Sequence, residues 1–133
     1  MDAVCVVLSI LFLPEYIEYE TARAGSFVPI EISVSSILLF FALGEEIAWR
    51  AFFQNKFSKI LPIVPVLFIS SLLFTLGHYE AGNNMVIIYG LIFTFINSIF
   101  YGIIFHKTKN AWISTFSHFA ANIFEVLLFE TFA

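Results

Sequence analysis

Six side chains along this sequence could do chemistry, although each lies within or beside an apolar stretch. They are Glu45, Glu46, Arg50, His78, His118 and Asn122. A carboxylate and an imidazole together can take a proton from water, and an imidazole with a carboxamide can stabilise an oxyanion. Hydrolysis by an activated water needs both functions. Because the six residues are distant in the sequence, only the fold can bring them together.

The composition indicates that lipid surrounds these groups. Of the 133 residues, 60% are apolar and only 12% are charged. In soluble domains, about 45–50% of the residues are apolar and roughly 25% are charged. A soluble domain of this size could not bury so much apolar surface, because about a third of its surface stays in water. A net charge of −4 with six basic residues excludes nucleic-acid binding. The single cysteine, Cys5, excludes an internal disulfide.

The apolar runs predict an all-α, polytopic transmembrane bundle with four full spans and a short N-terminal apolar helix. A span needs about 20 largely apolar residues, and the expected spans are 29–57, 60–77, 85–105 and 111–129. The run 3–13 has only 11 residues, so it is a short helix or the end of one that begins upstream of a truncated chain. The acidic stretch 14–26 is expected to be a polar connection. Residues 1–133 would form a single transmembrane domain.

Two short loops carry most of the basic residues and predict the orientation. Lys56 and Lys59 lie beside one predicted turn, and Lys107 and Lys109 lie in another turn two spans further along. Both turns are therefore on the same side of the membrane. Basic loops face the cytoplasm by the positive-inside rule, so we expect a multi-pass integral membrane protein with a cytoplasmic N-terminus.

The polar residues are expected at similar depth in the bilayer. An ionisable group there costs at least about 2.5 to 3.5 kcal/mol, so each should have a partner or a function. Counting from the predicted cytoplasmic turns at about 1.5 Å per residue places His118 about 12 Å deep and His78 about 24 Å deep. Glu45 and Asn122 both come out at about 18 Å. Three helices could therefore direct these groups into one cavity.

Local spacing arranges the polar residues on helix faces. Glu46 and Arg50 are four positions apart, which is the spacing of an intrahelical ion pair. His118, Asn122 and Glu125 stand at i, i+4 and i+7 and so share one face of the last predicted helix.

Three short motifs follow one another on these predicted helices. Residues 45–50 read EExxxR, residues 74–78 read FxxxH, and residues 118–122 read HxxxN. In this order, they resemble the CPBP family of CAAX proteases and bacteriocin-processing enzymes, also called the Abi family and related to type II CAAX prenyl endopeptidases. The similarity covers residues 33–124, which would be the core of the domain.

The resemblance implies an intramembrane endopeptidase. Its partners would be the bilayer and a membrane protein or peptide substrate, which could be lipidated, and its location would be a bacterial cytoplasmic membrane. By resemblance, Glu45 with His78 would activate water, and His118 with Asn122 would stabilise the oxyanion.

The remaining residues have supporting roles in this scheme. Glu46 and Arg50 match the other motif positions and are expected to hold the site by pairing with each other. Asn97 and Glu125 lie outside the motifs and are expected to support the site or the packing. A glutamate-dependent mechanism and a metalloprotease mechanism both stay open, because two histidines and a glutamate form a known zinc set. The ligands of such a zinc ion would be Glu45, His78 and His118.

Simpler explanations also fit these residues. Glu46 and Arg50 could be a purely structural pair, and His78 could lie at the membrane interface. A non-catalytic membrane protein that binds a peptide and confers bacteriocin immunity would share the fold. A transporter or ion pathway would also use buried carboxylates and histidines, although the chain has few spans for an inverted repeat. The sequence does not predict the cleavage site or the oligomeric state.

Overall fold

The computed structural model describes residues 2–25 and 31–131, and this part of the chain is helical without a strand. The helices are α1 (Asp2–Phe12), α2 (Pro14–Ala24), α3 (Ile32–Glu46), α5 (Ile63–Leu76), α6 (Asn84–Thr108) and α7 (Ala111–Glu130). From α3 the chain continues directly through a π-helical segment, η2 (Ile47–Gln54), into the short α4 (Asn55–Phe57). The all-α prediction is confirmed.

Three helices are long and apolar enough to cross a membrane. They are the continuous helix Ile32–Phe57 with 26 residues, α6 with 25 and α7 with 20. In contrast, α5 has 14 residues, or about 21 Å, which is short of the roughly 30 Å hydrocarbon core. Each predicted span contains a helix, but the predicted number of four full spans is not confirmed. The start of the first predicted span, at residues 29 and 30, lies outside the described residues.

The predicted polar connection 14–26 lies between α1 and α3, but most of it, Pro14–Ala24, forms helix α2, which was not predicted from the sequence. Proline is well placed in the first turn, where no N–H is needed. Glu15 in the first turn and Arg23 in the last turn complement the helix dipole. The buried residues recur every four positions and are Tyr16, Glu20 and Ala24. The stretch is therefore an amphipathic helix. It was not predicted because its composition is polar. Residue 26 lies outside the described residues.

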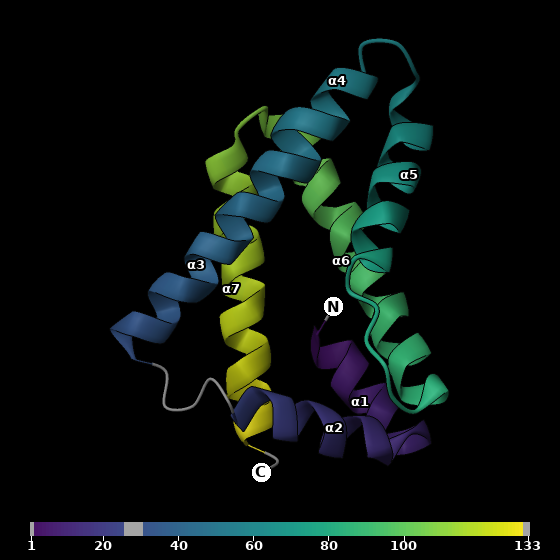
Figure 1. Cartoon of the computed structure of the whole chain (residues 1–133), viewed down its shortest axis with the longest axis vertical. Helices are drawn as coiled ribbons and strands as arrows, with labels where there is room; N and C mark the ends of the chain where they lie inside the picture. Colours follow the sequence, from purple (N-terminus) through teal and green to yellow (C-terminus); the bar gives the residue numbers. More distant parts are fainter. Residues whose placement is uncertain (1, 26–30, 132–133) are drawn as a thin grey trace.

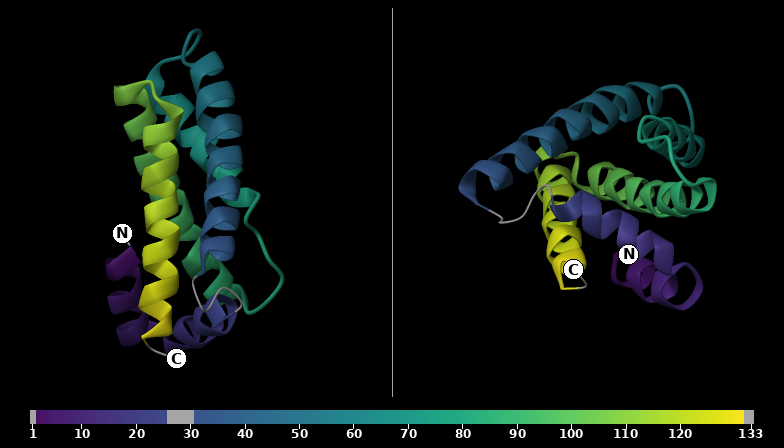
Figure 2. Two further views of the ribbon diagram at one scale, coloured as in Figure 1. Left: turned by 90° about the vertical axis from the view of Figure 1, so that its left-hand side faces the viewer. Right: turned by 60° about the horizontal axis from the view of Figure 1, so that its bottom comes forward.

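The long helices lie side by side. Helix α3 packs along α7, α5 packs along α6, and α6 contacts α7. Figure 1 shows this arrangement, with α2 lying across one end of the bundle. The views in Figure 2 show the same end from two other directions, where α2 contacts α7 close to the C-terminus. The space between the long helices is therefore covered by α2 at this end.

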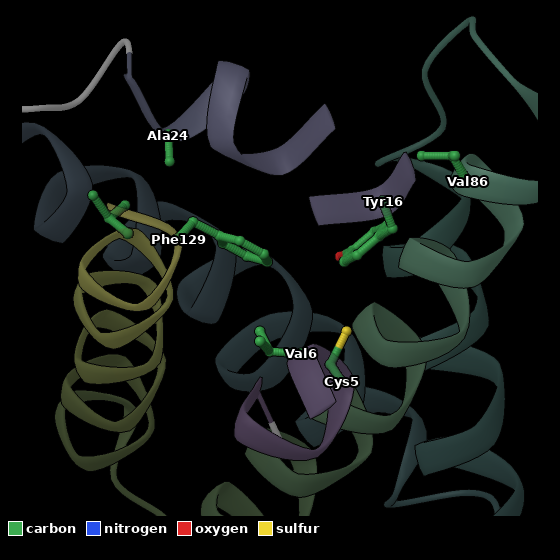
Figure 3. Close-up of a cluster of buried hydrophobic side chains, with 7 residues drawn as sticks. Cys5, Val6, Tyr16, Ala24, Val86 and Phe129 are labelled. Atoms are coloured by element: carbon green, nitrogen blue, oxygen red, sulfur yellow. The ribbon is translucent and has the colours of Figure 1, made fainter. Parts of the chain in front are cut away.

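A cluster of buried apolar side chains joins α1 and α2 to the bundle. The ring of Tyr16 makes edge contacts with Tyr89 and Phe129, at centroid distances of 4.8 and 6.1 Å. Figure 3 shows Tyr16 and Phe129 pointing toward one another, with Cys5 and Val6 of α1 beside them. This packing fixes α2 over the end of α7.

Polar side chains are concentrated inside the bundle and apolar ones outside. Glu46, Arg50 and Gln54 are at most 1% exposed, whereas Phe40 and Phe52 are 73% and 65% exposed. A soluble domain has the opposite distribution. The arrangement agrees with the expectation from composition that lipid is the solvent.

Asparagine side chains fix where α6 and α7 begin. Oδ1 of Asn83 accepts from the backbone N–H of Met85 at 3.0 Å, and Oδ1 of Asn110 accepts from that of Trp112 at 2.9 Å. These bonds satisfy N–H groups that a helix start leaves without partners. At the other end of α6, Lys109 adopts a left-handed conformation with φ 54°, which turns the chain sharply into α7.

Candidate active site

The most deeply buried part of the site is an ion pair on the α3–η2 helix. Glu46 and Arg50 have side chains 0% and 1% exposed, and Nε of Arg50 lies 3.4 Å from Oε2 of Glu46. The expected i, i+4 pair is therefore present. Nη2 of Arg50 also donates to the carbonyl and hydroxyl oxygens of Ser98 on α6, at 2.7 and 2.8 Å. The guanidinium lies 4.9 Å from the ring centroid of Phe74 on α5, a cation–π contact. The pair is thus fixed to two neighbouring helices.

Glu46 also holds His118 of α7. Nδ1 of His118 lies 3.0 Å from Oε1 of Glu46, and the hydroxyl of Ser114 donates to Oε2. On α6, the ring of Tyr101 stacks on the imidazole with centroids 4.5 Å apart. Glu46 therefore orients His118 in addition to neutralising Arg50.

The adjacent carboxylate, Glu45, faces two imidazoles. Its Oε1 lies 3.7 Å from Nε2 of His78, and its Oε2 lies 3.6 Å from Nε2 of His118. The Glu45 side chain is 34% exposed, in contrast to the fully buried Glu46. Neighbouring carboxylates thus have different surroundings, which is how two such groups take different roles.

His78 lies in the turn that follows α5, two residues beyond the last helical position. Its Nδ1 is 2.9 Å from the carbonyl oxygen of Phe74, and the two rings pack with centroids 4.4 Å apart. Because a carbonyl oxygen only accepts, this geometry assigns a proton to Nδ1. The Nε2 atom that faces Glu45 then carries a lone pair in the neutral ring.

The same reasoning applies to His118. An ionised Glu46 only accepts, so Nδ1 of His118 donates to it. Nε2 of His78 and the carboxylate of Glu45 are then acceptors, and Nε2 of His118 faces the same carboxylate. Their separations of 3.6 and 3.7 Å are longer than direct hydrogen bonds and suit groups that share a water. The arrangement can therefore bind and polarise a water molecule.

Gln54 extends the buried polar face by one helical turn. Its Nε2 donates to the carbonyl oxygen of Gly102 on α6 at 2.8 Å. A Cβ at Gly102 would lie 2.6 Å from Cδ2 of Leu67 and 3.0 Å from Oε1 of Gln54, so glycine allows the helices to approach. Arg50 and Gln54, four residues apart, thus contact Ser98 and Gly102, which are also four residues apart.

Four contributors to the site were missed by the sequence reasoning. They are Gln54, Ser98, Tyr101 and Ser114. The position of Gln54, four residues after Arg50, was a usable signal. Ser114, four residues before His118, carried the same signal. For Ser98 and Tyr101, no motif or spacing distinguishes them from the other polar and aromatic residues of the chain.

A cavity of about 270 Å³ opens beside this cluster. The expected site residues that line it are Glu45, His78, His118 and Asn122. Asn122 comes one helical turn after His118 and is partly buried. Asn97 and Glu125 also line the cavity, and Nδ2 of Asn97 donates to the Asp2 carboxylate at 2.8 Å. Glu46 and Arg50 are buried behind His118.

Charged residues of α2 and the α5–α6 connection line the other part of the cavity. The hydroxyl of Tyr19 donates to the Glu80 carboxylate at 2.5 Å. Arg23 lies 3.5 Å from Glu20 and 3.7 Å from Glu80. The hydrogen bond to Glu80 raises the pKa of Tyr19 to about 12, and burial raises the pKa of Glu20. These contacts tie α2 to the α5–α6 connection beside the cavity.

Zinc was an open alternative for Glu45, His78 and His118. Their donor types suit zinc, and the Nδ1 bonds of both histidines resemble the outer contacts of zinc ligands. Among the described residues, however, no group of three or more His, Cys, Asp or Glu side chains is arranged to hold a metal ion. Zinc at these three residues therefore stays a prediction.

The fold and the site together define a helical membrane protein with a buried centre suited to acid–base hydrolysis. Comparison with known families matches residues 28–124 to the type II CAAX prenyl endopeptidase Rce1-like family. Since the match covers most of the chain, the chain belongs to this family, and the resemblance seen in the three motifs is confirmed. Membership implies a CAAX-type membrane protease, a hydrolase whose substrate is a membrane-associated protein. Comparisons with curated proteins and with solved structures gave no match.

Proposed function

We propose that this protein cleaves a peptide bond of a membrane-associated protein or peptide within the bilayer, with Glu45 as the base. The observation that carries the proposal is the position of Glu45, whose two oxygens face Nε2 of His78 and Nε2 of His118 beside the cavity. The family name refers to a prenyl endopeptidase, so a lipidated substrate is the first to test.

In this mechanism, Glu45 accepts a proton from a water that also donates to Nε2 of His78. The water oxygen forms a bond to the carbonyl carbon of the substrate, and the carbonyl oxygen becomes an oxyanion. Collapse of this intermediate breaks the C–N bond, and Glu45 returns the proton to the leaving nitrogen. General acid–base catalysis of this kind contributes about 10²- to 10⁴-fold to the rate.

His118 and Asn122 would stabilise the oxyanion. Asn122 can donate through its amide, but His118 already uses Nδ1 toward Glu46. It can therefore donate through Nε2 only when the ring carries both protons. With an imidazolium at His118, the formal charges of Glu45, Glu46, Arg50 and His118 sum to zero. A neutral cluster is the arrangement that a low-dielectric site tolerates best.

The test is cleavage of an internally quenched, lipid-anchored peptide by the full chain in proteoliposomes. We expect Glu45→Gln to lower kcat at least 100-fold and Asn122→Ala to lower it about 10²- to 10³-fold. Glu18→Gln, which changes an exposed carboxylate on α2, is the matched control. Equal insertion of all variants is checked first. Wild-type cleavage by Glu45→Gln would refute the proposal, whereas an immunity phenotype that survives this change would favour the non-catalytic binding protein.

We also propose that the turns at the α4–α5 and α6–α7 ends face the cytoplasm of a bacterial cell. Figure 1 shows both turns at the same end of the bundle, which supports the same side for the lysines that flank them. A cysteine introduced by Lys107→Cys should be protected from a membrane-impermeant thiol reagent in intact cells. Labelling without permeabilisation would reverse the orientation.

A further inference from the structure

We infer that Ser114 and Tyr101, which lie outside the three motifs, are positioning residues that fix the imidazole of His118. The kinetic part of this inference rests on the proposed function, whereas the orientation of the ring can be measured without it. Neither side chain has a role in the mechanism above.

Ser114 fixes the carboxylate that orients the ring. It is 0% exposed and lies one helical turn before His118 on α7. Its hydroxyl donates to Oε2 of Glu46, while His118 donates through Nδ1 to Oε1. One helix therefore holds both oxygens of the same carboxylate. A rotation of Glu46 away from His118 would also break the bond to Ser114, a hydrogen bond to a charged group, which is costly to lose.

Tyr101 fixes the plane of the ring. Its ring stacks on His118 at an interplanar angle of 17° and a centroid distance of 4.5 Å. Phe74 contacts the same imidazole edge-on at 6.0 Å. In addition, the carbonyl oxygen of Tyr101 lies 3.3 Å from the hydroxyl of Ser114. A single residue of α6 thus contacts both His118 and the serine that holds its carboxylate.

This arrangement has a consequence for the direction of Nε2. With Nδ1 held by Glu46 and the ring plane held by Tyr101, Nε2 can point only toward Glu45 and the cavity. A ring held in one orientation and one plane is what oxyanion stabilisation requires, because a misdirected donor loses its effect.

The kinetic test compares two pairs of variants in the proteoliposome assay. Ser114→Ala removes the bond to Glu46, and its control is Ser117→Ala, whose hydroxyl donates to the carbonyl oxygen of Ile113 on the same helix. Tyr101→Leu removes the stacked ring, and its control is Tyr101→Phe. We expect Ser114→Ala to lower kcat about 10- to 100-fold, as for loss of a hydrogen bond to a charged group. Tyr101→Leu should lower it about 2- to 10-fold, as for loss of a stacked aromatic contact. KM should stay within about twofold, and both controls should match the wild type.

The structural test is the ¹⁵N spectrum of the histidine rings in detergent micelles. The chain has three histidines, which can be assigned by single substitution. We expect Nδ1 of His118 to be protonated in the wild type, and Ser114→Ala to change the ¹⁵N shift of this nitrogen while His78 is unchanged. Wild-type ¹⁵N shifts and kcat in both Ser114→Ala and Tyr101→Leu would overturn the inference. If Ser114→Ala does not fold, the comparison of Tyr101→Leu with Tyr101→Phe tests the inference by itself. If the wild type cleaves nothing, the proposed function fails and the ¹⁵N spectra alone decide.

Discussion

Replacement of Arg50 by methionine tests how the buried ion pair holds the site. The guanidinium is 1% exposed and its partner Glu46 is 0% exposed, so Arg50→Met removes the arginine counter-charge of a buried carboxylate that keeps its contacts to His118 and Ser114. Breaking a buried pair in this way costs about 3–5 kcal/mol. The two bonds to Ser98 are also lost, but polar contacts between membrane helices average about 0.6 kcal/mol each. The orphaned charge therefore dominates the expected loss of stability.

The double variant Glu46→Gln/Arg50→Met separates this charge effect from lost packing. Because it removes both charges, we expect it to recover at least half of the stability that Arg50→Met loses, while cleavage stays low. The free energy of unfolding is measured by denaturant titration in mixed micelles with far-UV circular dichroism. Arg23→Met, which removes a half-exposed arginine, is the control and should cost at most about 1 kcal/mol. If the double variant is no more stable than Arg50→Met, the argument from the orphaned carboxylate is wrong.

Three further predictions concern packing, metal and pH. Gly102→Ala should destabilise the protein by about 1–3 kcal/mol through overpacking, whereas Gly44→Ala, whose Cβ would meet nothing within 4 Å, should be neutral or stabilising in the same titration. Cleavage should be insensitive to a chelator, because the proposed mechanism uses no metal ion; loss that zinc alone restores would favour the metalloprotease mechanism. The pKa of Tyr19 is raised to about 12 by Glu80 from about 10 in the unfolded chain, so its bond stabilises the fold below about pH 10 and is lost toward pH 12. Between these two pH values, the free energy of unfolding of the wild type should therefore fall more than that of Tyr19→Phe. An equal fall in both proteins would contradict this prediction.

Much of the fold and the motif residues could be predicted because their signals are local. Apolar runs identify helices, and the spacing of Glu46 with Arg50 and of His118 with Asn122 follows from the helical period. Composition correctly indicated an apolar exterior. The positions of helix ends were harder to predict, since α5 ends at Leu76 and leaves His78 in a turn.

The rest of the site depends on contacts between helices, which one sequence does not reveal. Ser98, Tyr101 and Ser114 act only because α6 and α7 meet α3 in one particular register. Serine and tyrosine also occur elsewhere in the chain without such contacts, so residue type gave no signal. Helix α2 was missed for another reason, because its buried stripe includes the ionisable residues Tyr16 and Glu20. A reading based on apolar runs overlooks such a helix.

The different surroundings of the two adjacent glutamates explain why the motif contains both. A base at membrane depth must face the substrate, so Glu45 lies at the cavity and keeps its oxygens available. The charged base and the imidazole beside it also need neighbouring charges and hydrogen bonds that hold them in place. Glu46 provides these because it contacts Arg50, Ser114 and His118 together. Consecutive helical residues point about 100° apart, so one carboxylate can face the cavity while the other faces the protein interior. If this division is correct, Glu45→Gln should abolish cleavage with little loss of stability, whereas Glu46→Gln should lower both. Equal effects of the two changes on stability would show that the carboxylates do not divide these roles.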